Sequence, residues 1–373
     1  MVFMKKIKYF LFLLPPFMPF RTNAQLMRSP EIDNENRVTF YVRAPKAREV
    51  KVINLSDTMA MGAREYLLAP GEDDVWQITT LSCRPGFHYY ELSIDGFRCS
   101  DPSSQMYFGW GKWSSGLEVP NNNLDFYLPQ DVPRGVIRYQ EYQSSVTGTY
   151  RKCLIYIPSG YDLDKTAKYP VLFLQHGAGE NELAWTMQGK INIILENLIA
   201  SGKAQPMIVV MDNGYAARPG SENPQRPAPA DNVFEDLVVK ELIPMIDRNY
   251  RTLKGRESRA IAGFSMGAVQ ALIIGLKHPE LFASIGAFSG GGWNFNARTS
   301  FNGGFQDPGK INAAYRLIWI GCGEQDNGYQ GMKNFHETLD SLGINNVWYE
   351  GPGSHEWQVW RKHIYEFSQL VFK

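Results

Sequence analysis

An excess of charge of one sign is absent from this sequence. Its 373 residues include 38 lysines and arginines and 38 aspartates and glutamates, so the formal net charge at pH 7 is zero. A domain that binds nucleic acid needs a basic face to neutralise phosphates. Composition therefore excludes nucleic acid from the expected partners.

Cysteine is scarce, with four residues at Cys83, Cys99, Cys153 and Cys322. Their spacing matches no metal-ligand pattern and no cluster of His, Cys and Asp offers a metal site, so no metal and no cofactor are expected. An oxidising compartment would permit a Cys83–Cys99 disulfide. A tight turn at Asp95-Gly96 would instead place Leu92 opposite Cys99. Four free, mostly buried thiols are therefore favoured.

Apolar runs long enough to span a membrane are also missing. Residues 9–20 are apolar but too short to cross a bilayer, and they contain three prolines. Three lysines precede this run, and the small residues Thr22-Asn23-Ala24 follow it, which is the order of a secretory signal. Residues 1–24 are predicted to be a cleavable signal peptide and the protein to be secreted or periplasmic. An uncleaved membrane anchor is the alternative.

Residues 26–120 are predicted to form an all-β domain. Strand-like segments recur over 37–43, 49–54, 75–79 and 87–94, with turn residues between them. Short strands at this spacing are typical of a β-sandwich. Residues 103–134 are rich in aromatic and turn residues and are expected to be irregular, with a linker over 121–134. Their rings are Tyr107, Phe108, Trp110 and Trp113. Such rings could stack on sugars or pin the two domains together, and the second interpretation is favoured.

Several motifs of the first domain occur in a familiar order: Ser29-Pro30, residues 38–45, Trp76, Tyr89-Tyr90-Glu91, Asp95-Gly96 and Asp101-Pro102. In this order they resemble the immunoglobulin-like module that precedes many carbohydrate-active enzymes and is related to carbohydrate-binding module family 48. The resemblance implies an immunoglobulin-like sandwich in front of an enzyme.

From residue 135 to 373 the pattern changes to alternating strands and helices. The main predicted strands are 136–142, 150–157, 169–175, 207–211, 284–288, 315–320 and 347–350. Helices are predicted over 191–200, 234–250, 331–342 and 357–372. This alternation implies a mainly parallel sheet covered on both faces, the α/β class.

A serine between glycines, Gly263-Phe264-Ser265-Met266-Gly267, lies between a predicted strand and a predicted helix. This is the setting of a nucleophile elbow, where a sharp turn presents the serine hydroxyl. The helix that follows directs backbone N–H groups towards a developing oxyanion. The alternative is a glycine-rich turn with an idle serine, and it is tested by finding an acid and a histidine downstream.

The histidine is expected to be His355, because it lies in a loop between a predicted strand and the last helix. His278 is expected to cap the helix after Ser265, His336 to sit mid-helix, and His363 to lie on the surface of the last helix. For the acid, Asp326 is favoured over Glu324, since it sits further out in the loop after a strand. The acid would hold the imidazole in one tautomer.

The oxyanion hole is expected to combine the Met266 N–H with one from the loop after the strand at 169–175. Ala178 and Gly177 are the candidates in that loop, and His176 is expected to pack and hydrogen-bond there rather than to catalyse.

The second domain carries a specific set of motifs: Ile157-Pro-Ser-Gly-Tyr161, His176-Gly-Ala-Gly-Glu180 with Trp185, Gly263 to Gly267, Phe288-Ser-Gly290, Gly321 to Asp326, and Gly353-Ser-His-Glu-Trp357. Together they resemble carbohydrate esterase family 1, which includes bacterial feruloyl esterases and acetylxylan esterases and is related to enterochelin esterases. The resemblance implies an α/β-hydrolase fold and a serine esterase, and it places the acid at Asp326.

The expected function is a secreted serine esterase that cleaves feruloyl esters on plant cell-wall polysaccharide such as acylated xylan. Acetylxylan esterase, siderophore esterase and a non-catalytic carbohydrate-binding protein are the alternatives. Residues 213–231 and 290–309 are expected to wall an aromatic-sized slot. The candidate substrate-binding residues are Trp185, Trp293 and Trp357.

Overall fold

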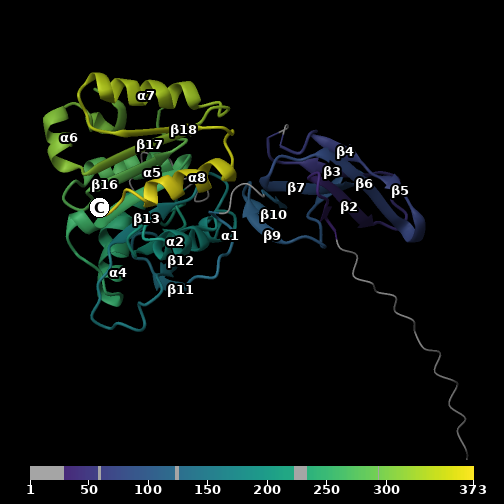
Figure 1. Cartoon of the computed structure of the whole chain (residues 1–373), viewed down its shortest axis with the longest axis horizontal. Coiled ribbons are helices and arrows are strands. Elements are labelled where there is room, and N and C mark those ends of the chain that lie inside the picture. Colours follow the sequence, from purple (N-terminus) through teal and green to yellow (C-terminus); the bar gives the residue numbers. More distant parts are fainter. Residues whose placement is uncertain (1–28, 58–59, 122–125, 222–232, 293) are drawn as a thin grey trace, which may run out of the picture.

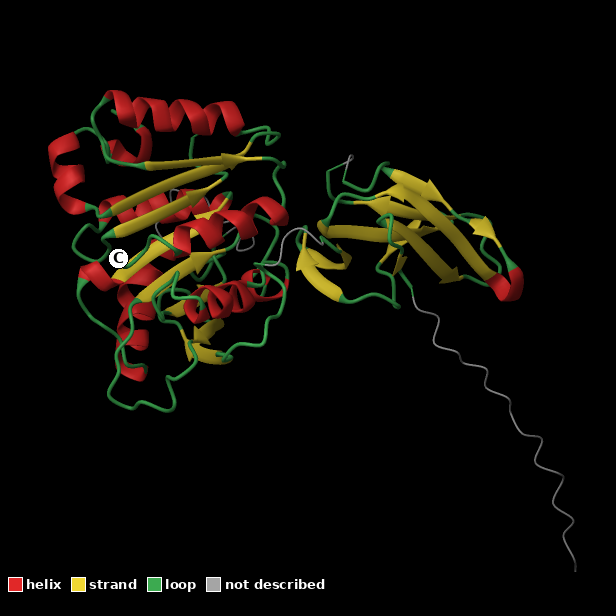
Figure 2. Cartoon of the chain, in the orientation of Figure 1, coloured by secondary structure: helices red, strands yellow, loops and turns green. Residues whose placement is uncertain are grey.

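The computed structural model describes residues 29–373 except 58–59, 122–125, 222–232 and 293 (Figure 1). The predicted signal peptide and Trp293 therefore lie outside the described residues. Two parts lie next to each other, an N-terminal β part and a larger α/β part (Figures 1 and 2).

The N-terminal part is a sandwich of two antiparallel sheets. One sheet has the order β1 (Glu31–Ile32), β2 (Arg37–Arg43), β6 (Val75–Ser82) and β5 (Ala69–Pro70). The other has the order β4 (Glu65–Leu67), β3 (Val50–Asn54), β7 (Gly86–Ile94), β10 (Lys112–Val119) and β9 (Met106–Gly109), with β8 (Phe97–Cys99) paired to β7. Alternate residues such as Phe40, Val52 and Leu92 are buried between the sheets. The immunoglobulin-like relationship stays a prediction.

The cysteine prediction is confirmed. Leu92 lies opposite Cys99 in the ladder between β7 and β8, and all four cysteines are free. Three of the thiols are buried, while Cys99 is partly exposed.

Residues 106–119 do not form an irregular linker, in contrast to the prediction. They contain the hairpin β9–β10, closed by the two residues Trp110 and Gly111. Both have positive φ, 59° and 77°, as the twist of a two-residue hairpin turn demands. Tryptophan is an unusual first residue for such a turn, and for that reason the sequence did not indicate a hairpin here.

The α/β part is built on one eight-stranded sheet. Its order is β11 (Val136–Gln143), β12 (Tyr150–Ile157), β14 (Ile208–Asp212), β13 (Val171–Gln175), β15 (Arg259–Phe264), β16 (Ser284–Phe288), β17 (Leu317–Gly323) and β18 (Val347–Gly351). The pairs β11–β12 and β12–β14 are antiparallel, and the remaining pairs are parallel. The predicted α/β class is confirmed for residues 136–351.

Helices cover both faces of this sheet. One face packs against α3 (Val233–Leu237), α4 (Ile243–Asn249), α5 (Met266–Lys277), α6 (Pro308–Ala314) and α7 (Tyr329–Ser341). The other packs against α1 (Ala184–Met187), α2 (Ile191–Ala200) and α8 (Trp357–Ser368). Among the residues that the structure describes, no helix is long and apolar enough to cross a membrane.

The single helix predicted over 234–250 is interrupted. A π-helical turn, Val238–Leu242, separates α3 from α4. Pro244 lies just beyond this turn and has no N–H to donate to a carbonyl one turn earlier in the helix. The hydrogen-bond ladder therefore shifts by one residue there.

The two parts share a hydrophobic core. Along β7, Tyr90 and Leu92 point into the sandwich, while Phe87 and Tyr89 point the other way. Phe87 and Tyr89 belong to the same buried cluster as Trp357 of α8, so the outer face of the second sheet is packed onto the α/β part.

A buried ion pair also joins the two parts. Arg361 of α8 is fully buried, and its two terminal nitrogens donate to both oxygens of Glu118 in β10, at 2.6 and 2.9 Å. Its Nε donates to the Gln188 carbonyl at 2.8 Å. A bidentate pair of this kind fixes the orientation as well as the distance of its partners.

Removing Glu118 should therefore destabilise the protein strongly. Glu118→Ala leaves the buried Arg361 guanidinium without its counter-charge, which costs about 3–5 kcal/mol in the free energy of unfolding. Urea denaturation measures the loss. The control is Asp162→Ala, which breaks the exposed Arg138–Asp162 pair and should cost less than about 1 kcal/mol. Equal losses in the free energy of unfolding for the two substitutions would contradict the role given to the Glu118–Arg361 pair.

Candidate active site

Ser265 occupies a strained turn between β15 and α5. Its backbone has φ 53° and ψ −116°, a conformation that L-residues rarely adopt. The strand ends at Phe264 and the helix begins at Met266, as the glycine-serine motif predicts. The Ser265 N–H donates to the Phe288 carbonyl at 2.9 Å, which ties the turn to the neighbouring strand β16.

The glycines around Ser265 leave room for backbone that passes very close. A Cβ atom on Gly263 would lie 2.6 Å from the Gly267 carbonyl carbon, and one on Gly267 would lie 2.6 Å from the His176 carbonyl oxygen. A Cβ atom on Gly290 would lie 2.4 Å from the Ser265 carbonyl oxygen. Side chains at these positions would push the serine out of its turn.

Asp326 and His355 form a hydrogen-bonded pair in which Asp326 is buried and His355 is exposed. His355 Nδ1 lies 2.7 Å from Asp326 Oδ2, and Asp326 Oδ1 accepts from the Gly328 N–H at 2.8 Å. Burial opposes ionisation of Asp326, but the hydrogen bond and charge of His355 outweigh it and hold the pKa of the carboxyl below its usual value. The carboxylate therefore fixes a proton on Nδ1 and leaves Nε2 free to act as a base.

The other candidates do not reach this pair. Glu324 is exposed, and its N–H is tied to the Gly351 carbonyl. His278 ends α5 and contacts Glu235, while His336 stacks on Trp348. His363 was predicted at the surface and this is wrong: it is buried between Trp319 and Phe288, because α8 presents that face to the sheet.

Hydrogen bonds that involve His176 and Tyr215 hold the loop after β13 in place. His176 Nδ1 donates to the Gly177 carbonyl at 2.8 Å, and its Nε2 accepts from the Gly214 N–H at 2.9 Å. Burial lowers the pKa of His176 to about 4, so the ring is neutral and holds the loop. The Gly179 N–H donates to Tyr215 Oη at 2.7 Å. These contacts leave the Ala178 and Met266 N–H groups without a partner among the described residues.

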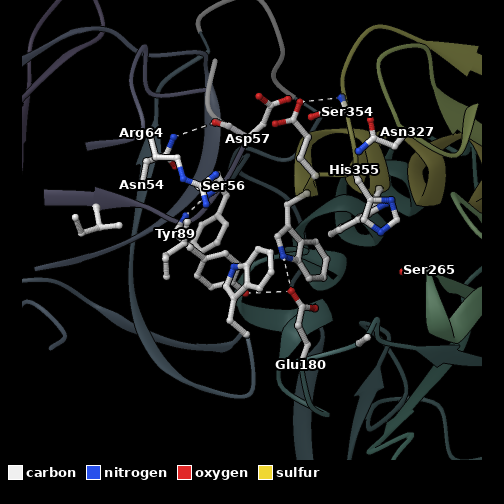
Figure 3. Close-up of a pocket in the computed structure, with 18 of the residues that line it drawn as sticks. Asn54, Ser56, Asp57, Arg64, Tyr89, Glu180, Ser265, Asn327, Ser354 and His355 are labelled. Atoms are coloured by element: carbon white, nitrogen blue, oxygen red, sulfur yellow. Dashed lines mark hydrogen bonds between the residues drawn. The ribbon is translucent and has the colours of Figure 1, made fainter. Parts of the chain in front are cut away.

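Ser265 and His355 both line a cavity of about 970 Å³ (Figure 3). Its walls come from both parts of the chain. Ala178, Phe264, Trp357 and Trp360 belong to the α/β part, and Ile53, Arg64, Tyr89, Arg98 and Trp110 belong to the sandwich. Figure 3 shows Arg64 and Tyr89 on one side of the cavity and His355 and Ser265 on the other. The described residues show no hydrogen bond between Ser265 Oγ and His355.

Of the predicted substrate-binding tryptophans that the structure describes, Trp357 lines this cavity and Trp185 does not. Trp185 is 1% exposed and donates to the Gln175 carbonyl at 2.8 Å, so it supports the loop from within the core. Trp293 lies outside the described residues. Trp357 does line the cavity, although only 2% of it is exposed.

The slot predicted between residues 213–231 and 290–309 is also wrong in its described portion. Phe295, Phe301 and Phe305 pack against one another and against Phe335 of α7, on the face of the sheet away from the sandwich. Tyr215 braces the loop after β13 instead of facing the cavity. The aromatic walls come from Phe264 of β15, from α8 and from the sandwich.

Residues of the sandwich wall were missed by the sequence analysis, which placed the entire site beyond residue 170. The alternation along β7 does separate Phe87, Tyr89, Glu91 and Ser93 from the residues that fill the sandwich core. That pattern shows that these side chains share a face. It does not show that the α/β part covers that face, since the contact joins residues far apart in sequence.

A mostly parallel sheet whose fifth strand runs into a strained serine turn defines the α/β-hydrolase class. Within that class the chain belongs to the esterase family described as "Putative esterase", whose family model matches residues 144–369.

Curated relatives include enzymes that act on xylan. The chain is 36% identical over 366 residues to an endo-1,4-beta-xylanase/feruloyl esterase of Xylanibacter ruminicola, covering 96% of this chain and 48% of that protein. It is 26% identical to the esterase Rv1288 of Mycobacterium tuberculosis, covering 64% of this chain and 58% of that protein. The chain thus spans about half the length of these relatives.

Solved structures of similar fold are also esterases. A CE1 ferulic acid esterase from Anaeromyces mucronatus, in complex with ferulic acid, aligns with a TM-score of 0.57 and 28% identity over 69% of this chain and 98% of that chain. The enterobactin esterase of Shigella flexneri aligns with a TM-score of 0.67 and 19% identity over 92% of this chain and 95% of that chain. The second likeness concerns the fold alone, and it extends over the sandwich.

Replacing the serine tests its role directly. Ser265→Ala should lower kcat/KM for p-nitrophenyl acetate on the order of a thousandfold or more, because no other side chain can form the acyl bond. Circular dichroism and the melting temperature should match those of the wild type or exceed them slightly. A correctly folded variant with near-normal hydrolysis would refute the assignment.

The acid is tested by a matched pair of substitutions. Asp326→Asn should lower kcat on the order of a thousandfold or more, since the amide cannot stabilise the imidazolium and favours the wrong tautomer. Glu324→Gln changes an exposed side chain in the same loop and should leave kcat within about twofold of the wild type. The reverse order of effects would assign the acid to Glu324.

Proposed function

We propose that this protein is a secreted serine esterase that hydrolyses feruloyl or related hydroxycinnamoyl esters on plant cell-wall polysaccharide such as arabinoxylan. The observation that carries the proposal is the cavity at Ser265. At about 970 Å³ and with Phe264, Trp357, Trp360 and Trp110 in its walls, it suits a planar aromatic acyl group and part of its sugar. An acetyl group requires neither the volume nor the rings.

The proposed reaction proceeds through an acyl-enzyme. His355 Nε2 takes the proton of Ser265 Oγ as that oxygen attacks the ester carbonyl. The carbonyl oxygen becomes an oxyanion that accepts hydrogen bonds from the N–H groups of Met266 and of Ala178 or Gly177. As the intermediate collapses, His355 returns the proton to the sugar oxygen and the alcohol leaves. Water then attacks the acyl-enzyme by the same route and releases the carboxylic acid.

The sandwich supports a polymeric partner. Its outer sheet face continues the cavity wall away from Ser265 through Ile53, Ser93 and Arg98, so a sugar chain that carries the ester has a surface to lie on. The relative from Xylanibacter ruminicola is named as a xylanase as well as a feruloyl esterase, and both names fit a xylan substrate. We accordingly propose four segments: a signal peptide over 1–24, a carbohydrate-binding-module-48-like sandwich over 26–120, a linker over 121–134 and the esterase domain over 135–373.

The acyl preference is tested with two substrates under one set of conditions. Release of ferulic acid from methyl ferulate and from feruloylated arabinoxylan should exceed release of acetate from acetylated xylan by at least about tenfold in kcat/KM, because the aromatic walls gain contacts only with the larger acyl group. Chromatography identifies the acids. Rapid acetate release with negligible ferulate release would make the protein an acetylxylan esterase.

Two further outcomes separate the remaining alternatives. Hydrolysis of a catecholate siderophore ester in preference to methyl ferulate would assign the cavity to siderophores. Binding of xylan with no hydrolysis of any ester, including p-nitrophenyl acetate, would make the protein a carbohydrate-binding protein.

A further inference from the structure

One buried carboxyl group lies where the two parts of the chain meet the candidate active site. Glu180 is 6% exposed and lines the cavity. Its Oε1 accepts two hydrogen bonds, from Tyr89 Oη at 3.1 Å and from Trp357 Nε1 at 3.0 Å (Figure 3). No step of the proposed reaction uses this residue.

The partners of Glu180 come from the elements that build the site. Tyr89 belongs to β7 of the sandwich, and Trp357 is the first residue of α8, two residues after His355. Glu180 itself is two residues after Ala178, at the end of the loop that offers oxyanion donors. A single carboxyl group therefore connects the sandwich, the His355 loop and the oxyanion loop.

The network around Glu180 sets the direction of its hydrogen bonds. Gln188 Nε2 donates to Tyr89 Oη and, at 3.0 Å, to the Phe108 carbonyl of β9. Tyr89 Oη therefore accepts from Gln188 and donates its own proton to Glu180 Oε1 at 3.1 Å, which is closer than the Phe108 carbonyl at 3.5 Å. The hairpin β9–β10 is attached through the same amide, so displacement of the sandwich would break the chain of hydrogen bonds.

Among the described residues, no cationic side chain contributes to the pKa of Glu180. Arg361 and Lys190 pair with Glu118, Arg84 with Glu356, His355 with Asp326, and Arg98 on the sandwich side of the cavity with Glu91. Arg64 lines the same cavity but forms no ion pair with Glu180. Its Oε2 has no hydrogen-bond partner among the described residues. Burial raises the pKa of Glu180 to about 8, and the hydrogen bonds from Tyr89 and Trp357 offset this only in part. Burial also raises the pKa of Tyr89 well above its usual value, so its hydroxyl remains a donor.

We propose that Glu180 is a positioning residue for ester hydrolysis, whose carboxyl group couples the docked sandwich to the placement of His355 and the oxyanion donors through its hydrogen bonds to Tyr89 and Trp357. This rests on the proposed function of Ser265 as the nucleophile. The sandwich is then part of the catalytic architecture, and small esters that never touch the polysaccharide surface depend on it. A carboxyl group that only fills the core would not couple Tyr89 to turnover.

Substitutions at both ends of the hydrogen bond test the coupling. In the full chain, Glu180→Leu and Tyr89→Phe should each lower kcat for p-nitrophenyl acetate about tenfold to a hundredfold, because small displacements of catalytic groups are costly. KM should change much less. Glu180→Gln keeps an oxygen acceptor of the same shape and should restore most of the kcat lost in Glu180→Leu. The double variant Tyr89→Phe/Glu180→Leu should lose no more than the more damaging single variant.

The pH profile distinguishes positioning from packing. In the wild type, kcat should fall as pH rises through about 8, where Glu180 loses its proton without a counter-charge. In Glu180→Gln this alkaline decline should move to higher pH, since the amide does not ionise. A merely structural residue would leave the profile in place.

The pH dependence of the melting temperature measures the protonation of Glu180 independently of catalysis. Because the pKa of Glu180 is higher in the folded than in the unfolded chain, the folded state binds more protons between about pH 4.5 and 8, and its stability falls as pH rises across that window. Glu180→Gln abolishes this dependence. The Tm of Glu180→Gln relative to wild type should therefore be higher at pH 9 than at pH 5.

The matched control is Tyr315→Phe. Tyr315 Oη is buried and donates to the Gly275 carbonyl at 2.7 Å, on the face of the sheet away from the sandwich. Its loss should lower Tm and leave kcat unchanged. The proposal is overturned if Tyr89→Phe behaves like Tyr315→Phe, or if Glu180→Gln keeps the wild-type alkaline decline. Failure of the wild type to hydrolyse any ester would overturn the proposed function instead, and the Tm comparison would still decide the state of Glu180.

Discussion

The packing of the outer face of β7 onto α8 is the contact on which the rest of the structure depends. Phe87 and Tyr89 belong to one buried cluster with Phe264, Trp357 and Trp360. Phe264 precedes Ser265, and Trp357 and Trp360 follow His355 in the chain. The rings that join the two parts are thus close in sequence to the residues proposed to carry out the chemistry. The ring of His355 also packs edge-on against Trp360, with 5.0 Å between the ring centroids.

The two parts that meet at this contact contribute different groups to the candidate site. In the proposed reaction, the α/β part supplies the serine, the acid–base pair and the oxyanion donors from loops at the carboxyl ends of its strands, where such sites form in open α/β sheets. The sandwich closes the cavity with a rigid sheet face. A wall made of a strand ladder and fixed by the Glu118–Arg361 pair holds its shape better than a surface loop.

Local patterns in the sequence were sufficient to predict single strands, helices and the turn at Ser265. The strand-serine-helix turn follows from glycines within four residues of each other, and the strands at Tyr150–Ile157 and Ser284–Phe288 follow from short apolar runs. His355 and Asp326 were found because each lies in a loop directly after a strand. The sandwich side of the cavity wall was not predicted, since the side chains of β7 meet Glu180 and α8 only through the docking of two folded parts. Glu180 entered the sequence analysis only as the last residue of the motif His176–Glu180, and nothing in its neighbourhood in sequence indicates burial without a counter-charge.

A structure of the full-length Ser265→Ala protein with a feruloylated arabino-oligosaccharide bound tests the central claim that the site lies between the two parts. The account predicts that the ester carbonyl oxygen lies within hydrogen-bond distance of the Met266 and Ala178 N–H groups, with the aromatic ring against Trp357 or Trp360 and the sugar in contact with the sandwich face near Tyr89 and Arg98. A ligand that occupies the loops at 213–231 and 290–309 and touches no residue of the sandwich would contradict it.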